Sequence, residues 1–457
     1  MKFRPWRPRK AVTIEYGKQS RVFLFVTGLI GQAYARHVLR LDRVAIEGRE
    51  RLVEEYRRAS TDEGRFVIAY RHPGDSDPHL VFHALTDLLL GEAPAMAEDG
   101  RPGAWYPSGT EVQLWASPLV LWALRNAGIV PVKHGGVDRA AIDFLVEGVA
   151  VRRRPMAIAP EGMATFHQDL VPDLDPGTAR IALLAAERLA REGKGTRVRI
   201  LPLAIDYSYS RATSLKRLGG FLSSLEARVG LEPRKGVPER PSSTTGDGSA
   251  EGEGHREEVG RLLAIWERIL TAAETGYART WGIGLAEKGS DLRFRTIALA
   301  EASVARLEAY YGVVPAQTLK GRILNIRAES LRRVFYEKKE LKAFSSLEAG
   351  MARRGAAEAY FLDQVYLVAT LAQFLDPSYI EDGDFDHLVE TAQNLYDLAN
   401  RLEGGSMGRR SRYFRKDARL IVGEPIEVGR KTGEGRREAA LRVQTELHDA
   451  FVRLIGR

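Results

Sequence analysis

Short apolar runs alternate with longer helical stretches between about residues 44 and 207. The strand-like runs are Val44–Glu47, Phe66–Tyr70, Ile129–Val132, Met156–Ala159 and Val198–Ile205. The helical stretches lie near Pro78–Leu90, Gln113–Asn126, Arg139–Arg152 and Pro176–Arg191. Strands that alternate with helices predict an α/β fold with a mostly parallel sheet flanked by helices. Functional groups are then expected where strands end and loops begin.

The pattern becomes helical after Tyr207. A stretch near 233–254, rich in Pro, Ser, Thr, Gly and Glu, predicts a disordered loop. In the helices that follow, one apolar seam has alternating spacings of three and four: Ile297, Ala300, Val304, Leu307 and Tyr311. Such a seam favours the interior of a helical bundle over an oligomer interface.

The α/β pattern returns near the C-terminus, where Arg419–Val422 reads as a strand and Arg437–Leu454 as an amphipathic helix. An isolated strand would leave its backbone groups unpaired, so we expect it to join the first sheet. The predicted organisation is a basic arm and helix at 1–39, an α/β domain at 40–210 plus 412–457, and a helical insertion at 211–411. A plain two-domain chain is the alternative.

The first 39 residues combine a basic arm with a weakly apolar run, Val22–Ala35. This run is shorter than the roughly 20 residues that span a bilayer, and no signal-peptide cleavage pattern follows it. Trp6, Phe23 and Phe25 would suit a lipid headgroup boundary. The helix is therefore predicted either to lie at a membrane surface or to pack on its own domain.

Composition limits the kinds of site and partner that this chain can have. The 457 residues contain no cysteine, which excludes disulfides, thiolate metal sites and cysteine nucleophiles. The formal net charge of +8 suits anionic partners such as acidic lipid, coenzyme A, acyl carrier protein or a phosphorylated substrate. No nucleic-acid partner is expected, because the basic residues are scattered without an aromatic-interleaved patch.

The richest chemical signal follows the Phe66–Tyr70 strand, where His72 precedes Asp77 by five positions. The Pro73–Gly74 turn can fold Asp77 back onto the imidazole, which would make His72 a general base and Asp77 its orienter. A surface turn capped by Asp77 is the alternative. The same stretch also carries His79 and His83, so a metal-dependent hydrolase is a rival prediction.

Two further turns follow strands. Gly136 and Arg139 lie in a Gly-Gly-Val-Asp-Arg run that opens a helix, an arrangement that suits a phosphate. Pro160, Glu161 and Gly162 form a turn whose carboxylate would bind substrate hydroxyls or organise nearby arginines. The first turn has a plainer explanation as a helix cap, and the second has one as an ordinary exposed turn.

These motifs, in this order, resemble the blocks of the PlsC-like glycerophospholipid acyltransferases. The resemblance covers the His72-x4-Asp77 motif, the residues 136–139, Pro160–Gly162 and the strand around Pro202. It extends to an Ala-rich helix within 173–187 and to a Gly-Glu-Pro-Ile turn at 423–426, but not to the helical region.

The resemblance implies an enzyme of phospholipid biosynthesis that acylates a lysophospholipid or glycerol phosphate. Its donor would be acyl-CoA or acyl carrier protein, and no metal or redox cofactor would be needed. His72 and Asp77 would be catalytic, and Gly136, Arg139, Pro160, Glu161 and Gly162 would bind the acceptor. The protein would be peripheral to the inner face of the cell membrane. A non-catalytic lipid-binding protein of the same fold is a further alternative.

The third block departs from the family pattern, since Met163 and Ala164 stand where Thr-Arg is usual. The sequence offers Arg139, Lys133 and the Arg152–Arg154 run as other cations for an acceptor phosphate. An acceptor without phosphate is the alternative.

Overall fold

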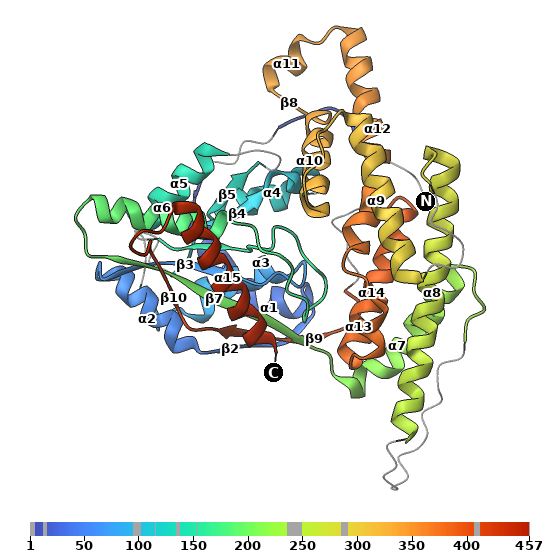
Figure 1. Ribbon diagram of the computed structural model, residues 1–457, viewed down its shortest axis with the longest axis horizontal. Coiled ribbons are helices and arrows are strands. Elements are labelled where there is room, and N and C mark those ends of the chain that lie inside the picture. The colour runs from blue at the N-terminus through green and yellow to red at the C-terminus, as the bar shows by residue number, and fades with distance from the viewer. Residues whose placement is uncertain are drawn as a thin grey trace. The chain divides into compact units, whose positions relative to one another are not determined.

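The computed structural model describes residues 5–11, 16–94, 102–114, 116–133, 138–152, 154–234, 249–284, 291–405 and 412–456. The chain forms two compact units (Figure 1). The α/β unit comprises Thr13–Val112, Ala116–Ser208 and Lys416–Arg457. The helical unit comprises Tyr209–Arg415 with the short segments Met1–Val12 and Gln113–Trp115.

The α/β unit is built on a six-stranded, mostly parallel sheet. Its order is β2 (Leu41–Glu47), β9 (Lys416–Val422), β7 (Arg197–Ser208), β3 (Gly64–Tyr70) and β6 (Met156–Ile158), with β10 (Ile426–Val428) also pairing with β7. The pairs β2–β9, β3–β7 and β3–β6 are parallel, whereas β7 is antiparallel to β9 and β10. The predicted α/β class with a mostly parallel sheet is thus confirmed, and the C-terminal strand does join the first sheet.

One predicted strand lies outside this sheet. Ile129–Val132 forms β5, which pairs with β4 (Tyr106–Gly109) in a separate two-stranded sheet. The sequence did not indicate β4, because its Tyr-Pro-Ser-Gly run reads as a turn. Without β4, the pattern offered no partner for β5 other than the main sheet.

Helices cover both faces of the main sheet, as alternate residues of β3 show. Phe66, Ile68 and Tyr70 belong to one buried cluster, and Val67 and Ala69 to another. The first cluster takes in residues of α1 (Arg21–His37), α2 (Arg49–Ser60) and α3 (Asp77–His83). The second takes in residues of α5 (Arg139–Ala150), α6 (Gly177–Arg191) and α15 (Arg436–Ile455).

Shorter elements complete this unit. A π-helical turn, Ala84–Leu88, continues α3, and α4 is Pro118–Asn126. A 3-10 turn, Thr110–Leu114, spans the boundary between the two units.

Pro202 occupies the middle of β7, where a missing N–H would normally break the ladder. The amide of Gly423 donates to the Pro202 carbonyl at 2.9 Å. A strand residue directs its N–H and C=O to the same side, so the Pro202 nitrogen faces the turn between β9 and β10. On that side β10 pairs with Val198–Ile200 and β9 with Leu203–Ser208. Pro202 therefore lies at the position along β7 between the part that pairs with β10 and the part that pairs with β9.

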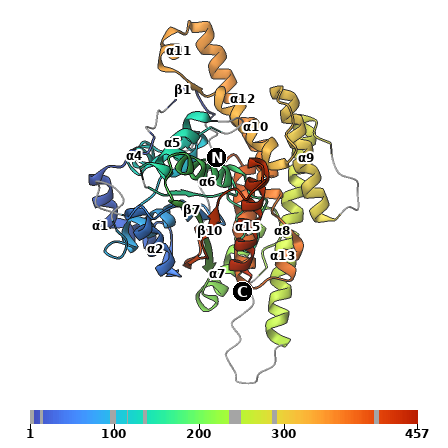
Figure 2. The same cartoon turned by 60° about the vertical axis from the view of Figure 1, so that its left-hand side comes forward.

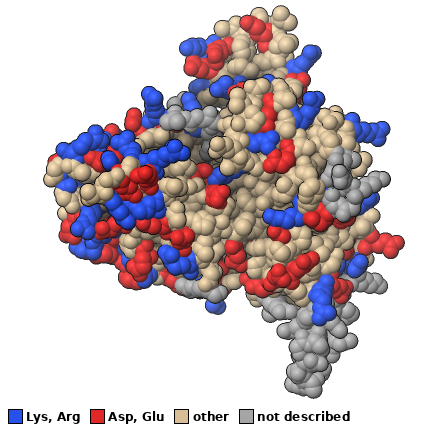
Figure 3. Space-filling view, viewed as in Figure 1, with Lys and Arg blue, Asp and Glu red and all other residues tan. Residues whose placement is uncertain are grey.

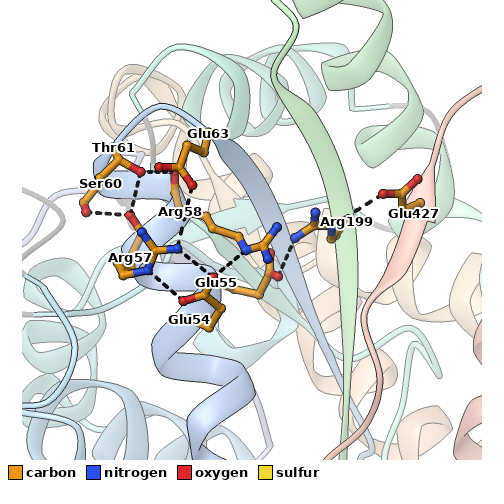
Figure 4. A network of polar contacts seen from close by, with 9 residues as sticks. All are labelled: Glu54, Glu55, Arg57, Arg58, Ser60, Thr61, Glu63, Arg199 and Glu427. Atoms are coloured by element: carbon orange, nitrogen blue, oxygen red, sulfur yellow. Dashed lines mark hydrogen bonds and ion pairs between the residues drawn. The ribbon is translucent and has the colours of Figure 1, made fainter.

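An ion-pair network stabilises the start of β7 (Figure 4). Glu55 on α2 accepts from Arg199 at 2.7 Å, and Arg199 also approaches Glu427 on β10 at 3.9 Å. This network lies near the opposite end of β7 from Tyr207. It joins α2, β7 and β10 away from the motif that follows β3.

The helical unit contains eight helices among the described residues. They are α7 (Arg211–Arg228), α8 (Ser249–Trp281), α9 (Leu292–Tyr311), α10 (Leu319–Arg332), α11 (Lys338–Ala343), α12 (Ser346–Ala372), α13 (Pro377–Glu381) and α14 (Phe385–Leu402). In the predicted seam, Ala300, Val304 and Leu307 are buried within the bundle.

Two boundaries differ from the predictions. Helix α8 begins at Ser249, so the end of the loop predicted near 233–254 is helical, while 235–248 lie outside the described residues. In the predicted 1–39 segment, Arg9–Lys10 form β1 and pair with β8 (Phe335–Tyr336) of the helical unit. Helix α1 instead belongs to the α/β unit. No described helix is both long and apolar enough to cross a membrane.

Candidate active site

The structure brings His72 and Asp77 together at the end of β3. The amide of Arg71 donates to the Leu203 carbonyl at 2.9 Å and so continues the β3–β7 ladder up to the motif. The chain then turns at Pro73–Gly74 and enters α3 at Asp77. The His72 Nδ1 lies 2.9 Å from the Asp77 Oδ2, as the spacing predicts.

Asp77 is completely buried and held from several directions. Its Oδ2 also accepts from the Gly74 amide at 2.6 Å, and its Oδ1 accepts a short hydrogen bond from the Tyr207 hydroxyl. The His72 side chain, by contrast, is 19% exposed. The pair therefore combines a fixed internal carboxylate with an imidazole that reaches the surface.

Tyr207 and Lys416 complete these surroundings, and the sequence motifs gave no sign of either. Tyr207 lies near the end of β7 and Lys416 at the start of β9. The Lys416 ammonium lies 3.2 Å from the centre of the Tyr207 ring. Only the position of Tyr207 at a strand end could have suggested a role beside the site.

The pKa of His72 reflects two opposing effects. Burial favours the neutral imidazole, and this effect is outweighed by the hydrogen bond and charge of Asp77 together with the charges of Glu161 and Asp75. The resulting pKa lies above the ordinary value of 6.5. With Asp77 ionised, Nδ1 donates its proton to the carboxylate and Nε2 keeps a lone pair. The geometry thus supports a general base at Nε2.

Glu161 lies next to the pair but does not reach the surface. Its Oε1 accepts from the Arg71 Nε at 2.5 Å and from the His72 amide at 3.1 Å. The side chains of Arg71 and Glu161 are both 0% exposed. A substrate contact through Glu161 does not fit this burial. The second predicted role, the organisation of a nearby arginine, does fit.

Pro160 and Gly162 shape the loop that carries Glu161. The Pro160 carbonyl accepts from the Asp175 amide at 2.6 Å. Gly162 has a φ of +74°, and a Cβ at this position would collide with the Asp175 carboxylate. The same loop returns to the motif after β3, because the Thr165 amide donates to the His72 carbonyl at 3.0 Å. These residues support the backbone around His72.

Arg139 is exposed at the first position of α5. Asp138 caps this helix by accepting from the Ala141 amide at 3.2 Å, and it also accepts from the Lys133 amide at 3.1 Å. Among the described residues, no hydrogen bond or ion pair joins Arg139 to His72 or Asp77. Gly136, the other predicted member of this turn, lies outside the described residues.

The Arg152–Arg154 run is a poor alternative for binding phosphate. Arg152 forms an ion pair with Glu147 at 3.0 Å. Arg154 is buried, and its guanidinium lies 4.8 Å from the centre of the Trp105 ring. Arg153 lies outside the described residues. Arg139 and Lys133 are the exposed cations that remain from the predicted set.

The histidines predicted as alternative metal ligands have separate partners. The His79 Nδ1 lies 3.3 Å from the Tyr34 hydroxyl on α1, and the His83 Nδ1 lies 2.8 Å from the Asp87 Oδ2. In the part of the chain that the structure describes, no three His, Asp or Glu side chains form a group that could hold a metal ion.

An apolar face lies on α1 and α4, and we call it the α1–α4 face. Its large side chains are exposed, the most exposed being Val22, Phe25, Leu29, Ile30, Leu119 and Trp122. Phe23 and Leu24 of α1 are buried, and the Phe23 ring lies 5.4 Å from the Trp122 ring of α4. Helix α1, which lies at the edge of the α/β unit in Figure 2, therefore packs on its own unit and also has exposed apolar residues.

Basic residues border the α1–α4 face. Lys18, Arg21 and Arg36 lie beside or on α1, Arg125 lies in the last turn of α4, and all four are exposed. Neither helix contains an acidic residue. The surface over α5 and α6 is different, because basic and acidic side chains are interspersed there (Figure 3).

Comparisons with known proteins give no relative: no family model, no curated protein and no solved structure matches this chain. The interpretation of the site therefore depends on its own geometry and on the motifs that carry it.

Proposed function

We propose that this protein is an acyltransferase that moves a fatty acyl group from acyl-CoA or acyl carrier protein to the hydroxyl of a lysophospholipid or glycerol phosphate. The observation that carries the proposal is the His72–Asp77 pair, with a 2.9 Å contact, a buried carboxylate and a partly exposed imidazole. Activation of a hydroxyl needs such an oriented base.

In the proposed reaction, the His72 Nε2 accepts the proton of the acceptor hydroxyl. The oxygen attacks the thioester carbonyl, and the carbon–sulfur bond breaks as the new ester forms. His72 then returns the proton to the thiolate that leaves. Asp77 holds Nδ1 and stabilises the imidazolium between these steps. A positioned base typically contributes about 10²–10⁴ in rate.

The exposed N-terminus of α5 supports the proposed binding of the acceptor phosphate. Arg139 supplies an exposed guanidinium there, a group that pairs with phosphate oxygens. Gly136 is proposed to let the backbone approach the same group. Pro160, Glu161 and Gly162 are proposed to act indirectly, by holding the backbone of His72 in place.

The α1–α4 face supports the proposed location at the inner face of the cell membrane. Its exposed apolar residues can enter the headgroup boundary, while the bordering cations attract anionic lipid. Helix α1 contacts α3 through Tyr34 and His79, and α3 begins with Asp77. Docking through this face would bring a lysolipid acceptor close to α3, which carries the carboxylate that orients the proposed base.

Purified H72A and D77N variants test the catalytic proposal in an acyl-transfer assay with acyl-CoA or acyl carrier protein and lysophosphatidate. We expect H72A to lose at least about 10² in kcat/KM. His448 and Asp449 provide matched controls, because they form an exposed pair on α15, 3.8 Å apart. H448A and D449N should retain full activity.

Full activity in H72A or in D77N would refute the proposed mechanism. If the wild-type protein binds lysolipid but never turns over, the non-catalytic alternative is favoured. Stoichiometric zinc or manganese in the purified protein, together with hydrolysis that a chelator abolishes, would favour the hydrolase alternative.

A further inference from the structure

The carboxylate of Asp77 has a second buried partner that the proposed reaction does not yet use. The Tyr207 hydroxyl donates to Oδ1, while Oδ2 serves His72 and the Gly74 amide. Tyr207 is itself 1% exposed. The two carboxylate oxygens are thus held by donors from different strand ends.

Tyr207 is fixed independently of Asp77. Its backbone pairs with Ala418 on β9, and its amide donates to the Gln168 Oε1 at 2.9 Å. The ring therefore approaches Asp77 from a position set by the sheet. Because the hydroxyl is attached to a rigid strand, it restricts rotation of the carboxylate away from His72.

Lys416 places a positive charge against the same ring. Its Nζ lies 3.2 Å from the centre of the Tyr207 ring, within the range of a cation–π contact. A Cβ built on Gly74 would lie 3.5 Å from the Tyr207 ring and 3.8 Å from the Lys416 Nζ. The ring and the ammonium therefore lie together against the turn that joins His72 to Asp77.

We propose that Tyr207 and Lys416 are positioning residues for the His72–Asp77 pair. The Tyr207 hydroxyl holds the Asp77 carboxylate and takes up part of its negative charge, and the Lys416 ammonium makes this hydroxyl a stronger donor. Tyr207 and Lys416 together determine how strongly Asp77 attracts the proton on His72. This inference rests on the proposed function for its catalytic consequence only, because the effect on His72 can be measured without turnover.

Several charged groups act on His72 besides Lys416, whose effect is proposed to pass through Tyr207 and Asp77. Asp77, Glu161 and Asp75 all favour the imidazolium. Arg71 is paired with Glu161 and partly offsets that carboxylate. The Tyr70 ring packs at 6.3 Å from the imidazole. A test must therefore change Tyr207 and Lys416 while these groups stay in place.

The first measurement is an NMR titration of the His72 imidazole in the full-length protein, assigned by comparison with H72A. We expect Y207F to raise the pKa of His72 by roughly 0.5–1, because Asp77 keeps more of its charge when it loses a donor. The matched control is Y56F, since Tyr56 is also buried and its hydroxyl donates to the Gly103 carbonyl. An unchanged or lower pKa of His72 in Y207F would overturn the proposal.

The second measurement distinguishes an effect of Lys416 that passes through Tyr207 and Asp77 from direct charge repulsion between Lys416 and His72. K416M should raise the pKa of His72 in the wild-type background and by less than half as much in the Y207F background. Equal shifts in both backgrounds would show that Lys416 acts on His72 directly, and the proposed effect through Tyr207 and Asp77 would be overturned. K194M is the control, because Lys194 pairs with Glu192 on the surface.

Kinetics then tests the catalytic consequence. Y207F should lower kcat roughly 5- to 50-fold with little change in KM. If the predicted pKa shifts occur in a protein with no acyl transfer, the positioning role stands and the proposed reaction fails. If acyl transfer is found but Y207F has wild-type kcat and an unshifted pKa of His72, the positioning role fails alone.

Discussion

His72 and Asp77 depend on their immediate neighbours for their chemical character. Asp77 is fully buried and accepts hydrogen bonds from three groups. The His72 imidazole and the Gly74 amide belong to the local turn, whereas the Tyr207 hydroxyl comes from a distant strand. Burial lowers the pKa of His72, but the hydrogen bond and charge of Asp77, with the charges of Glu161 and Asp75, outweigh burial and raise it above its ordinary value. The protonation state of His72 is therefore a measurable property of the site.

The pH dependence of acyl transfer follows from this shift. A general base must be neutral, so the rate should rise with pH through the pKa of His72, and the acid limb of kcat/KM should lie above pH 6.5. In D77N the favourable hydrogen bond and charge are lost, so the limb should move to lower pH while the maximum rate falls. A pH–rate profile of both proteins checks the direction. A limb that stays in place in D77N would contradict this assignment.

The Arg71–Glu161 pair predicts a change in stability. Both side chains are 0% exposed, and E161Q would leave the guanidinium of Arg71 buried without its counter-charge. Breaking such a pair typically costs about 3–5 kcal/mol. Urea unfolding should therefore show a clear loss of stability in E161Q. E192Q is the matched control, because Glu192 pairs with Lys194 at the surface and such pairs contribute little.

At the scale of elements, the turn at Gly162 links the loop after β6 to the site. Its φ of +74° and the closeness of Asp175 leave no room for a side chain. G162A should destabilise the protein by about 1–3 kcal/mol and lower acyl transfer, because the loop that supports His72 is displaced. G195A should be neutral in the same unfolding and activity assays, since a Cβ there would meet nothing within 4 Å. Wild-type stability in G162A would contradict the strain at this turn.

A prediction about membrane binding concerns helix α1. Phe25 and Leu29 are 60% and 69% exposed on the outward side of the helix. F25D/L29D should lose most binding to vesicles that contain anionic lipid, because charges at these positions oppose insertion of an apolar face. Vesicle sedimentation measures the loss.

The control for α1 is L441D/V452D, which places the same charges on exposed apolar positions of α15. Equal vesicle binding by both double variants would exclude a special role of the α1–α4 face. Wild-type protein should also prefer anionic vesicles over zwitterionic ones, since cations border this face.

At the scale of the whole molecule, the α/β unit is assembled from both ends of the chain. Strand β9 lies between β2 and β7, so the sheet is interrupted without it. A chain that ends at Arg415 lacks β9, β10 and α15 and should fail to form a folded α/β unit. Removal of only Gly456 and Arg457, which follow α15, should leave folding intact.

Circular dichroism and proton NMR of the two truncated chains check this expectation. A folded sheet in the chain that ends at Arg415 would mean that β2 and β7 can pair without the C-terminal strand. The same experiment bears on the site, because Lys416 and the backbone partner of Tyr207 both lie on β9.

The features of this protein that local pattern encodes could be predicted from its sequence. The period of apolar residues located the strands β3, β6 and β7 and most helices, because burial on one or both faces imposes that period. The five-residue spacing and the Pro-Gly turn determined that Asp77 could return to His72, since both lie within one turn of the chain. The need of an isolated strand for partners determined that β9 would join the first sheet.

Contacts between segments that are distant in the sequence became apparent only in the folded structure. Tyr207 reaches Asp77 across 130 positions, and Glu161 meets Arg71 across 90, and no local pattern records such contacts. The folded structure also shows that Glu161 is buried, that Arg154 packs on Trp105, and that β5 pairs with β4 rather than with the main sheet. Periodicity reports which faces are buried but not against what, so partners and exposure emerge only when the sheet and its covering helices assemble.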